Sequence, residues 1–205
     1  MNTQVTPGTW RYAAPPLVLA IPATVLYFPL GLALLALGLA VVAFFRDPER
    51  TPPDSGIVAP AHGKVSVVRE EGDQVRVGVF MNVTDVHVIR APADGYVESV
   101  TRRPGAYKPA FSKDSDRNER VDVDFGTHEV SFIAGWFARR IHPYVDGGEE
   151  IRRGQRLGHI AFGSRPDVPL PEWADIDDIQ VEKGQRVTAG ETVVVETPDA
   201  DERSE

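Results

Sequence analysis

Three short segments of this 205-residue chain carry side chains that could take part in catalysis. The segment MNVTDVHVIRAP places Asp85 two residues before His87, so on a β-strand both side chains would lie on one face. A carboxylate beside an imidazole raises its basicity and fixes its tautomer, as a general base requires. The segments APAHG and HIAFGSRPDVPLP add His62, which precedes a glycine, and the pair Gly163 and Ser164. Taken alone, an ordinary turn is the simpler interpretation of these last two segments.

The residues that other kinds of site need are missing or badly spaced. The chain has no cysteine, which excludes a disulfide framework, thiolate zinc sites and cysteine nucleophiles. His128, His142 and His159 show no spacing typical of metal ligands, so we expect no metal site. The net charge of −8 and a long apolar segment argue against a nucleic-acid partner.

That apolar segment, residues 13–45, contains no charged residue. As one straight helix it would be about 50 Å long, whereas the hydrocarbon core of a bilayer is about 30 Å thick. Pro22 and Pro29 divide it, so we expect a membrane-embedded hairpin of two helices, roughly 13–28 and 29–45. One long tilted helix is the alternative. Arginines follow the segment directly, which favours a location at the cell membrane with a cytoplasmic catalytic domain.

The rest of the chain is expected to be all-β. From Ile57 onward, short runs of alternating apolar and polar residues are separated by Gly and Pro about every ten residues, which is typical of a sandwich or barrel. APAHGKV at 59–65 recurs as APADGYV at 91–97, and RRGQRLGHI at 152–160 is echoed by EKGQRVTAGETV at 182–193. These echoes predict a duplicated, lipoyl-like (hammerhead) β-sandwich in which glycine permits the tight turns.

The predicted organisation is an N-terminal tail (1–12), a membrane helical hairpin (13–46), a catalytic β domain (47–197) and an acidic disordered tail (198–205). The repeat also supports a rival function, because lipoyl-like modules act as carriers or as membrane adaptors. A carrier needs a cofactor lysine at a hairpin tip. Neither of the two lysines beside a turn glycine lies in the Met-Lys-Met-like context that a ligase would recognise, which leaves a non-enzymatic membrane adaptor as the rival.

Taken together and in order, FFRDPER, APAHGKV, FMNVTDVHVIRAP, NER, IAGWFARRI and RLGHIAFGSRPDVPLP resemble the short, archaeal-type form of the phosphatidylserine decarboxylase family over about residues 44–195. The resemblance implies that the chain cuts itself between Gly163 and Ser164 without water. Ser164 Oγ would attack the Gly163 carbonyl, an N-to-O acyl shift would give an ester, and β-elimination would follow. The products are a β chain that ends at Gly163 and an α chain, 164–205, that begins with a covalent pyruvoyl group.

The resemblance also implies the reaction of the mature enzyme. Its substrate would be a serine phospholipid, archaetidylserine or phosphatidylserine, and its product the ethanolamine phospholipid. The pyruvoyl ketone would form a Schiff base with the serine amine and act as an electron sink while carbon dioxide leaves. His87 would then be the acid and base, with Asp85 beside it. A homodimer is compatible with the family.

One position departs from the family's pattern. The usual P-A-D-G motif has an aspartate where this chain has His62, and that aspartate orients the base that activates the serine. His62 itself, or Asp94 in the repeated PADG, is the candidate substitute. We place His62 first because it occupies the family's own position. A third alternative is failed maturation, which would make the chain an inactive relative.

Overall fold

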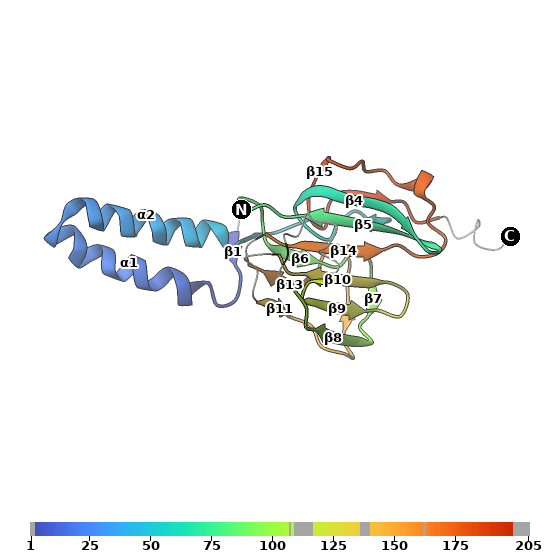
Figure 1. Ribbon diagram of the computed structural model, residues 1–205, viewed down its shortest axis with the longest axis horizontal. Coiled ribbons are helices and arrows are strands. Elements are labelled where there is room, and N and C mark those ends of the chain that lie inside the picture. Colours follow the sequence, from blue (N-terminus) through green and yellow to red (C-terminus); the bar gives the residue numbers. More distant parts are fainter. Residues whose placement is uncertain (1–2, 107, 109–116, 136–139, 162, 199–205) are drawn as a thin grey trace. The chain divides into compact units, whose positions relative to one another are not determined.

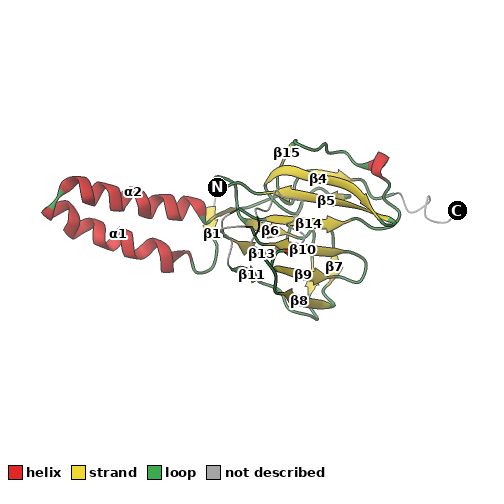
Figure 2. Cartoon of the chain, in the orientation of Figure 1, coloured by secondary structure: helices red, strands yellow, loops and turns green. Residues whose placement is uncertain are grey.

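The computed structural model describes residues 3–106, 108, 117–135, 140–161 and 163–198. The chain divides into two compact units, Met1–Glu49 and Arg50–Glu205. The first is a helical hairpin, and strands dominate the second (Figures 1 and 2). The mainly β fold predicted for the larger part of the chain is therefore confirmed. The predicted acidic tail lies outside the described residues, apart from Pro198.

The apolar run forms two helices, α1 (Thr9–Leu26) and α2 (Phe28–Phe44). Tyr27 separates them with extended backbone angles, φ −155° and ψ 98°. Proline lies in the first turn of α2, where its missing N–H removes no helical hydrogen bond. Pro22, which we expected to divide the run, instead lies inside α1. The alternative of one long tilted helix is wrong, because the chain reverses at Tyr27.

The first residues form structure rather than a free tail. β1 (Thr3–Val5) pairs antiparallel with β2 (Arg46–Pro48), and α1 already begins at Thr9. Strands of three residues are too short to show an alternating pattern, so sequence periodicity could not reveal this pairing. The pair joins the two ends of the hairpin.

The two helices approach each other through small residues. A Cβ atom at Gly31 would collide with Thr24, and one at Gly38 would collide with Leu17. The buried residues of the hairpin helices are otherwise alanine and threonine. Glycine and other small residues allow helix backbones to pack this closely.

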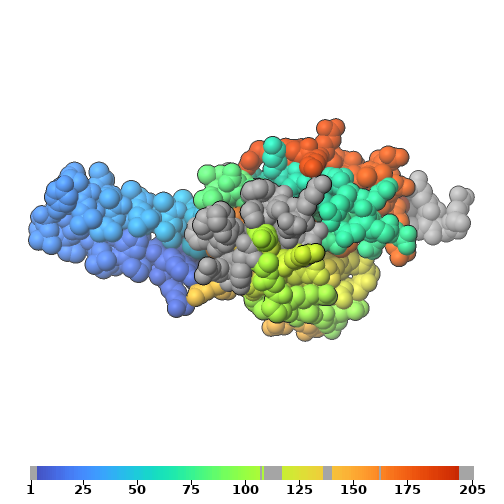
Figure 3. Space-filling view, in the orientation of Figure 1, coloured from blue at the N-terminus to red at the C-terminus, as the bar shows by residue number. Residues whose placement is uncertain are grey.

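Figure 3 shows the surface of the hairpin in blue. Many of its large apolar side chains are exposed. Ile21, Val25 and Leu26 are 74%, 85% and 86% exposed. This distribution is the reverse of that in a water-soluble helical pair, where large apolar side chains lie inside. In the described part of the chain, no helix combines the length and the hydropathy needed to cross a bilayer.

The strands of the second unit pair antiparallel. Their bounds are β3 (Ile57–Val58), β4 (Gly63–Glu71), β5 (Gln74–Phe80), β6 (Val88–Arg90), β7 (Gly95–Tyr96), β8 (Ser99–Arg103), β9 (Arg120–Asp124), β10 (Glu129–Ile133), β11 (Ile141–Pro143), β12 (Glu150–Ile151), β13 (Arg156–Ile160), β14 (Arg165–Pro169), β15 (Arg186–Val187) and β16 (Val193–Val195). A short 3-10 helix, Ile176–Asp178, precedes β15.

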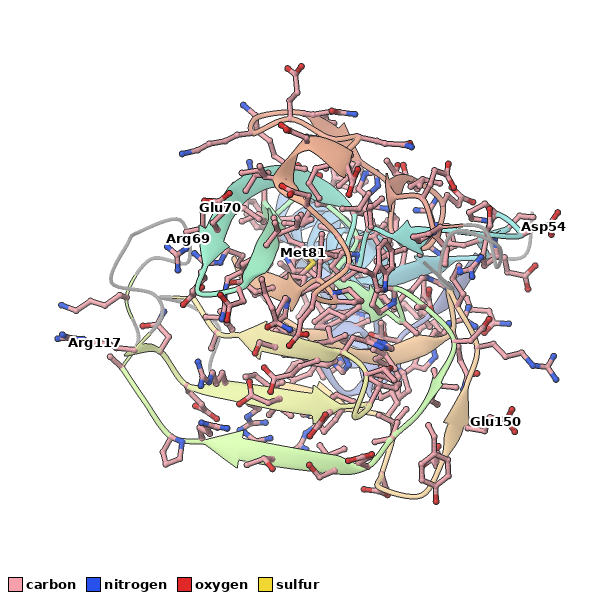
Figure 4. All side chains as sticks on the ribbon, turned by 90° about the vertical axis from the view of Figure 1, so that its right-hand side faces the viewer. Asp54, Arg69, Glu70, Met81, Arg117 and Glu150 are labelled. Atoms are coloured by element: carbon pink, nitrogen blue, oxygen red, sulfur yellow. The ribbon has the colours of Figure 1, made fainter. Side chains whose placement is uncertain are left out.

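The largest sheet has the strand order β15-β4-β5-β14-β10-β9-β8. A three-stranded sheet has the order β11-β13-β6, and β12-β7 and β16-β3 form separate pairs. Along β5, the alternate residues Val75, Val77 and Val79 lie in the hydrophobic core, as the period-two pattern predicts. Met81, labelled in Figure 4, follows β5 and is fully buried. The core thus continues past the end of β5, toward the start of β14.

The predicted repeat appears as two halves with matching hydrogen bonds. In the first half, Gly190 N–H donates to the Ala59 carbonyl at 2.9 Å, and Gly184 N–H donates to the Val65 carbonyl at 2.8 Å. The two glycines have φ of 72° and 99°, in the left-handed region that favours glycine.

In the second half, Gly154 N–H donates to the Ala91 carbonyl and Gly148 N–H to the Val97 carbonyl, both at 2.8 Å. Their φ angles, 73° and 97°, match those of the first half. Gly184 therefore corresponds to Gly148, and not to Gly154 as the Gly-Gln echo suggested. The Gly-Gln echo reflects a shared turn instead. Gln155 N–H donates to the Arg152 carbonyl and Gln185 N–H to the Glu182 carbonyl, and each glutamine Oε1 accepts the N–H at the start of its turn.

Candidate active site

Ser164 lies immediately before β14, in the middle of the largest sheet. Its side chain is fully buried, and its Oγ makes no hydrogen bond to the described residues. Its carbonyl oxygen accepts the Met81 N–H at 3.0 Å, which continues the register of β14 and β5 three residues beyond the pair of Asp167 and Gly78. A buried hydroxyl without a partner costs about 1–3 kcal/mol, so such a group calls for a functional explanation.

Gly163 precedes it with φ of 60°, in the left-handed region. No atom of the described residues lies within 4 Å of the position that a Cβ atom would take, so among these residues the backbone conformation, rather than crowding, favours glycine here. The chain bends at Gly163 and then enters the pairing with Met81 at Ser164. Attack of Ser164 Oγ on the Gly163 carbonyl carbon would close a five-membered ring, which covalent geometry makes accessible.

His87 lies just before β6 and is 2% exposed. Its Nδ1 lies 2.9 Å from the backbone carbonyl oxygen of Asp85. Because a carbonyl oxygen only accepts, Nδ1 carries the proton in this contact, and the neutral ring has its lone pair on Nε2. The His87 carbonyl accepts the Ile160 N–H at 3.3 Å, which ties His87 to the segment that leads to Ser164.

The sequence predicted that Asp85 and His87 share one face of a strand, and this prediction was wrong. Residues 82–85 form a turn, in which the Asp85 N–H donates to the Asn82 carbonyl at 2.9 Å, and β6 begins only at Val88. The Asp85 carboxylate accepts the Asn82 N–H at 2.8 Å, as aspartate commonly does in turns, and it also pairs with the guanidinium of Arg186. Asp85 thus contacts the imidazole through its backbone, and its side chain stabilises the turn.

His62 directly precedes β4 and is half-buried. A Cβ atom at its neighbour Gly63 would collide with the carbonyl oxygen of Phe80. The next residue, Met81, pairs with Ser164. Gly63, Met81 and Ser164 therefore form one row across β4, β5 and β14. Neighbouring strands are about 4.8 Å apart, so this row spans about 10 Å. The structure brings the backbone of His62 to the row that contains Ser164.

Asp94 occupies the equivalent position in the second half of the repeat. Its carboxylate accepts the Arg153 N–H at 2.7 Å, and its side chain is 69% exposed. It precedes β7, which pairs with β12, whereas Ser164 lies in the largest sheet. The pseudo-symmetry thus places Asp94 in the other half of the sandwich and gives its carboxylate a structural contact there.

Sequence reasoning missed a histidine cluster beside His87. The pairing of β11 with β13 stacks the His142 and His159 rings, with centroids 4.6 Å apart, and the Tyr144 hydroxyl lies 2.6 Å from His159 Nδ1. Burial, with the neighbouring His142 and His87, lowers the pKa of His159 to about 4. These residues share no motif, so only the strand register could reveal the cluster. Among the described residues, no group of three or more histidine or acidic side chains could hold a metal ion.

Several known proteins are similar to this chain. A sequence model of the family described as "Phosphatidylserine decarboxylase" matches residues 37–195. The "Putative archaetidylserine decarboxylase proenzyme" of Halobacterium salinarum is 55% identical over 189 residues, which cover 92% of this chain and 96% of that relative. The protein of the same name from Methanosarcina acetivorans is 44% identical over 160 residues, 75% of this chain and 74% of that relative.

A bacterial protein is similar as well. The "Phosphatidylserine decarboxylase proenzyme" of Streptomyces avermitilis is 47% identical over 154 residues, 73% of this chain and 70% of that relative. No solved structure matches the chain. The similarity thus covers the candidate site, from His62 through Ser164, as well as both halves of the repeat.

Proposed function

This chain belongs to the phosphatidylserine decarboxylase family, and from that premise we propose that it is a self-processing carboxy-lyase of serine phospholipids. It removes the carboxylate of the serine headgroup as carbon dioxide and leaves the ethanolamine phospholipid. The observation that carries the proposal is the junction of Gly163 and Ser164. There a left-handed glycine leads into a fully buried hydroxyl that has no hydrogen bond to the described residues.

Maturation begins when Ser164 Oγ loses its proton and attacks the Gly163 carbonyl carbon. The peptide C–N bond breaks, the Ser164 nitrogen takes up a proton, and Gly163 is left esterified to Oγ. A base then removes the α-proton of Ser164 and the Cβ–Oγ bond breaks, which releases Gly163 as a carboxylate. The remaining dehydroalanine takes up water and loses ammonia, so the α chain begins with a pyruvoyl group at its N-terminal end.

The residues around Ser164 fit such a group. The new chain terminus would start a strand that is paired on both sides, and no described residue crowds the Cβ position of Gly163, at the departing end of the β chain. The pyruvoyl ketone supplies an acceptor for the electron pair that carbon dioxide leaves behind. His87, with its lone pair on Nε2, is the residue that would hold a proton for return to the substrate carbon.

We assign the Ser164 Oγ proton to His62 during self-cleavage. His62 stands at the family's aspartate position and directly precedes Gly63, which lies in one row with Met81 and Ser164. Its imidazole would act directly or through one bridging water. Asp94 is the less favoured substitute, because its carboxylate contacts Arg153 and is mostly exposed.

The lipid substrate we propose is archaetidylserine. The supporting observation is that the Halobacterium relative, named for that lipid, is 55% identical, whereas the Streptomyces relative, named for phosphatidylserine, is 47% identical. Purified enzyme assayed with both lipids tests the assignment. A strong preference for the ester-linked lipid would overturn it.

We also propose that the β unit is a lipoyl-like sandwich and that the hairpin associates with the cell membrane, with the catalytic unit on the cytoplasmic side. The matched glycine turns of the two halves support the first proposal. The exposed Ile21, Val25 and Leu26 support the second, because contiguous apolar surfaces commonly mark membrane contacts. Replacing all three by serine should reduce co-sedimentation with anionic lipid vesicles. Val83→Ser, at an exposed site of the other unit, should leave it unchanged.

The family resemblance leads us to propose a homodimer. Light scattering of the purified protein, with the detergent contribution subtracted, should then give twice the 22.5 kDa of one chain. The mass of a single chain would contradict this proposal and leave the proposed reaction unaffected.

A denaturing gel with intact-mass measurement tests the proposed function. We expect a small α chain that begins at residue 164 with a pyruvoyl group, and Ser164→Ala should abolish both cleavage and decarboxylation. Ser131→Ala is the matched control, because Ser131 is also buried in the largest sheet but donates its hydroxyl to Asp122 at 2.6 Å. A single full-length band from active cells would refute self-processing.

A further inference from the structure

An ion pair that the cleavage chemistry does not use follows Ser164 directly. Arg165 Nε and Nη2 donate to the two carboxylate oxygens of Asp167 at 2.6 Å and 2.8 Å. Both residues are buried, 3% and 0% exposed. A two-bond guanidinium–carboxylate contact fixes direction as well as distance. The first residues of β14 are therefore held by a side-chain contact along the strand itself.

The backbone of β14 is weakened at the same place. Pro166 lies between Arg165 and Asp167, in a strand that has neighbours on both sides, β5 and β10. Proline has no N–H to donate, so it is rare in an interior strand. The Ser164 carbonyl and the Leu170 N–H both bond to β5. Because backbone groups alternate sides along an antiparallel strand, the nitrogen of Pro166 also faces β5, where it can supply no hydrogen bond. The ion pair bridges the two residues on either side of this gap.

The neighbouring strand leaves room for the Asp167 carboxylate. Asp167 pairs with Gly78 of β5, and a Cβ atom at Gly78 would collide with Oδ1 of Asp167. Arg76, on the same strand, places Nη1 3.6 Å from Oδ2. A fully buried carboxylate is tolerated only where charge and hydrogen bonds compensate its lost hydration. Residues of both β5 and β14 therefore accommodate the Asp167 carboxylate.

Self-cleavage turns β14 from an internal strand into the first strand of a separate chain. In the precursor, covalent chain holds Ser164 from both sides. After cleavage, β14 becomes the first element of the α chain, and chain termini fray unless they are tied down. The reacting group derived from Ser164 is then attached directly to Arg165. Fraying at this position would move it relative to His87.

We infer that the Arg165–Asp167 pair is an anchor that holds the start of the α chain in register after cleavage. Arg165 and Asp167 are positioning residues, because they act on the reacting group through the strand that carries it. The inference rests on the proposed function. It assigns these residues to turnover by the mature enzyme, and leaves cleavage of the precursor largely independent of them.

Two variants test the anchor without leaving a buried charge unpaired. Arg165→Lys keeps the positive charge but loses the two-bond contact, and the double variant Arg165→Met with Asp167→Asn removes both charges together. In each, we expect precursor cleavage within about 3-fold of the wild-type rate and KM within about 2-fold. The kcat of the cleaved enzyme should fall about 10-fold or more, since small misplacements of reacting groups have effects of this order.

Asp122→Asn is the matched control. Asp122 is also buried and lies in the same row of the sheet, because Asp122 and Asp167 both face Ser131 of β10. It pairs with Arg103 and Arg120 instead, at 2.8 Å and 3.3 Å. This variant should lose stability but keep the ratio of kcat to cleavage rate seen in the wild type. If Arg165 only stabilised the fold, the Arg165 variants and Asp122→Asn would all have the same ratio of kcat to cleavage rate.

Amide hydrogen exchange measures directly whether the start of β14 opens more often when the ion pair is altered. In cleaved Arg165→Lys, the amides of Asp167 and Val168 should exchange about 10-fold faster than in the cleaved wild type, while those of β9 stay unchanged. Equal losses of cleavage and turnover, or an unchanged kcat, would overturn the anchor while leaving the proposed function in place. A wild-type chain that is never cleaved would refute both.

Discussion

The Nδ1 atom of His87 lies 2.9 Å from the backbone carbonyl oxygen of Asp85, and the Asp85 carboxylate contacts Asn82 and Arg186 instead. The backbone contact fixes the tautomer of the imidazole. It also makes the orientation of His87 depend on the turn at residues 82–85 rather than on one side chain.

Substitutions at these two residues should therefore differ greatly in effect. His87→Ala should lower kcat about 100-fold or more, as expected for loss of a general acid or base. Asp85→Asn keeps the backbone carbonyl and an oxygen that can accept the Asn82 N–H, so kcat should fall less than about 10-fold. Steady-state rates of carbon dioxide release from the cleaved enzymes give the comparison. Equal losses in the two variants would show that the Asp85 carboxylate acts on His87.

Self-cleavage should depend on His62 and hardly at all on Asp94. His62→Ala should stall the precursor, and His62→Asp should restore cleavage by returning the family's usual residue. Asp94→Asn is the matched control, because it alters the equivalent position in the other half of the repeat. Its oxygen can still accept the Arg153 N–H. A time course of precursor loss on denaturing gels distinguishes them, and a stalled Asp94→Asn precursor would reverse the assignment.

Gly163 should tolerate an added side chain sterically but not conformationally. Its φ of 60° costs an ordinary residue about 1–2 kcal/mol, although the Cβ position is open. The Gly163→Ala variant should therefore fold, but its precursor should cleave about 10-fold more slowly, because fewer molecules adopt the left-handed conformation at residue 163. Gly163→Asn should cleave faster than the alanine variant, since asparagine tolerates left-handed angles. If alanine cleaves at the wild-type rate, the left-handed turn is not needed for attack.

Acid should destabilise the protein partly through His159. Burial, with His142 and His87, lowers the folded-state pKa from 6.5 to about 4. Between these values the unfolded chain binds more protons than the folded one, so the free energy of unfolding falls as the pH drops from 6.5 toward 4. Urea titrations across this window should show a flatter dependence for His159→Gln. His128, whose pKa burial also lowers to about 4, should account for a further share of the slope. An unchanged slope in both His159→Gln and His128→Gln would contradict these assignments.

Much of the fold could be predicted because it depends on local sequence. The chain reversal near Pro29 and the alternation of Val75, Val77 and Val79 follow from backbone geometry and side-chain periodicity. The Gly163–Ser164 junction was identified through the family resemblance, because the two residues taken alone indicate only a turn. The sequence by itself therefore determined the helical hairpin and the β character of the larger unit, and its resemblance to a family supplied the bond proposed for cleavage.

Only the tertiary structure decided how distant segments meet. The turn that directs Asp85 away from His87, the stacking of His142 on His159 and the correspondence of Gly184 with Gly148 all depend on strand register. A shift of one residue in register would move each side chain to the opposite face, and no local pattern specifies that choice. Register is set by how the whole core packs, so the residues that contact the catalytic candidates could not be predicted from the sequence.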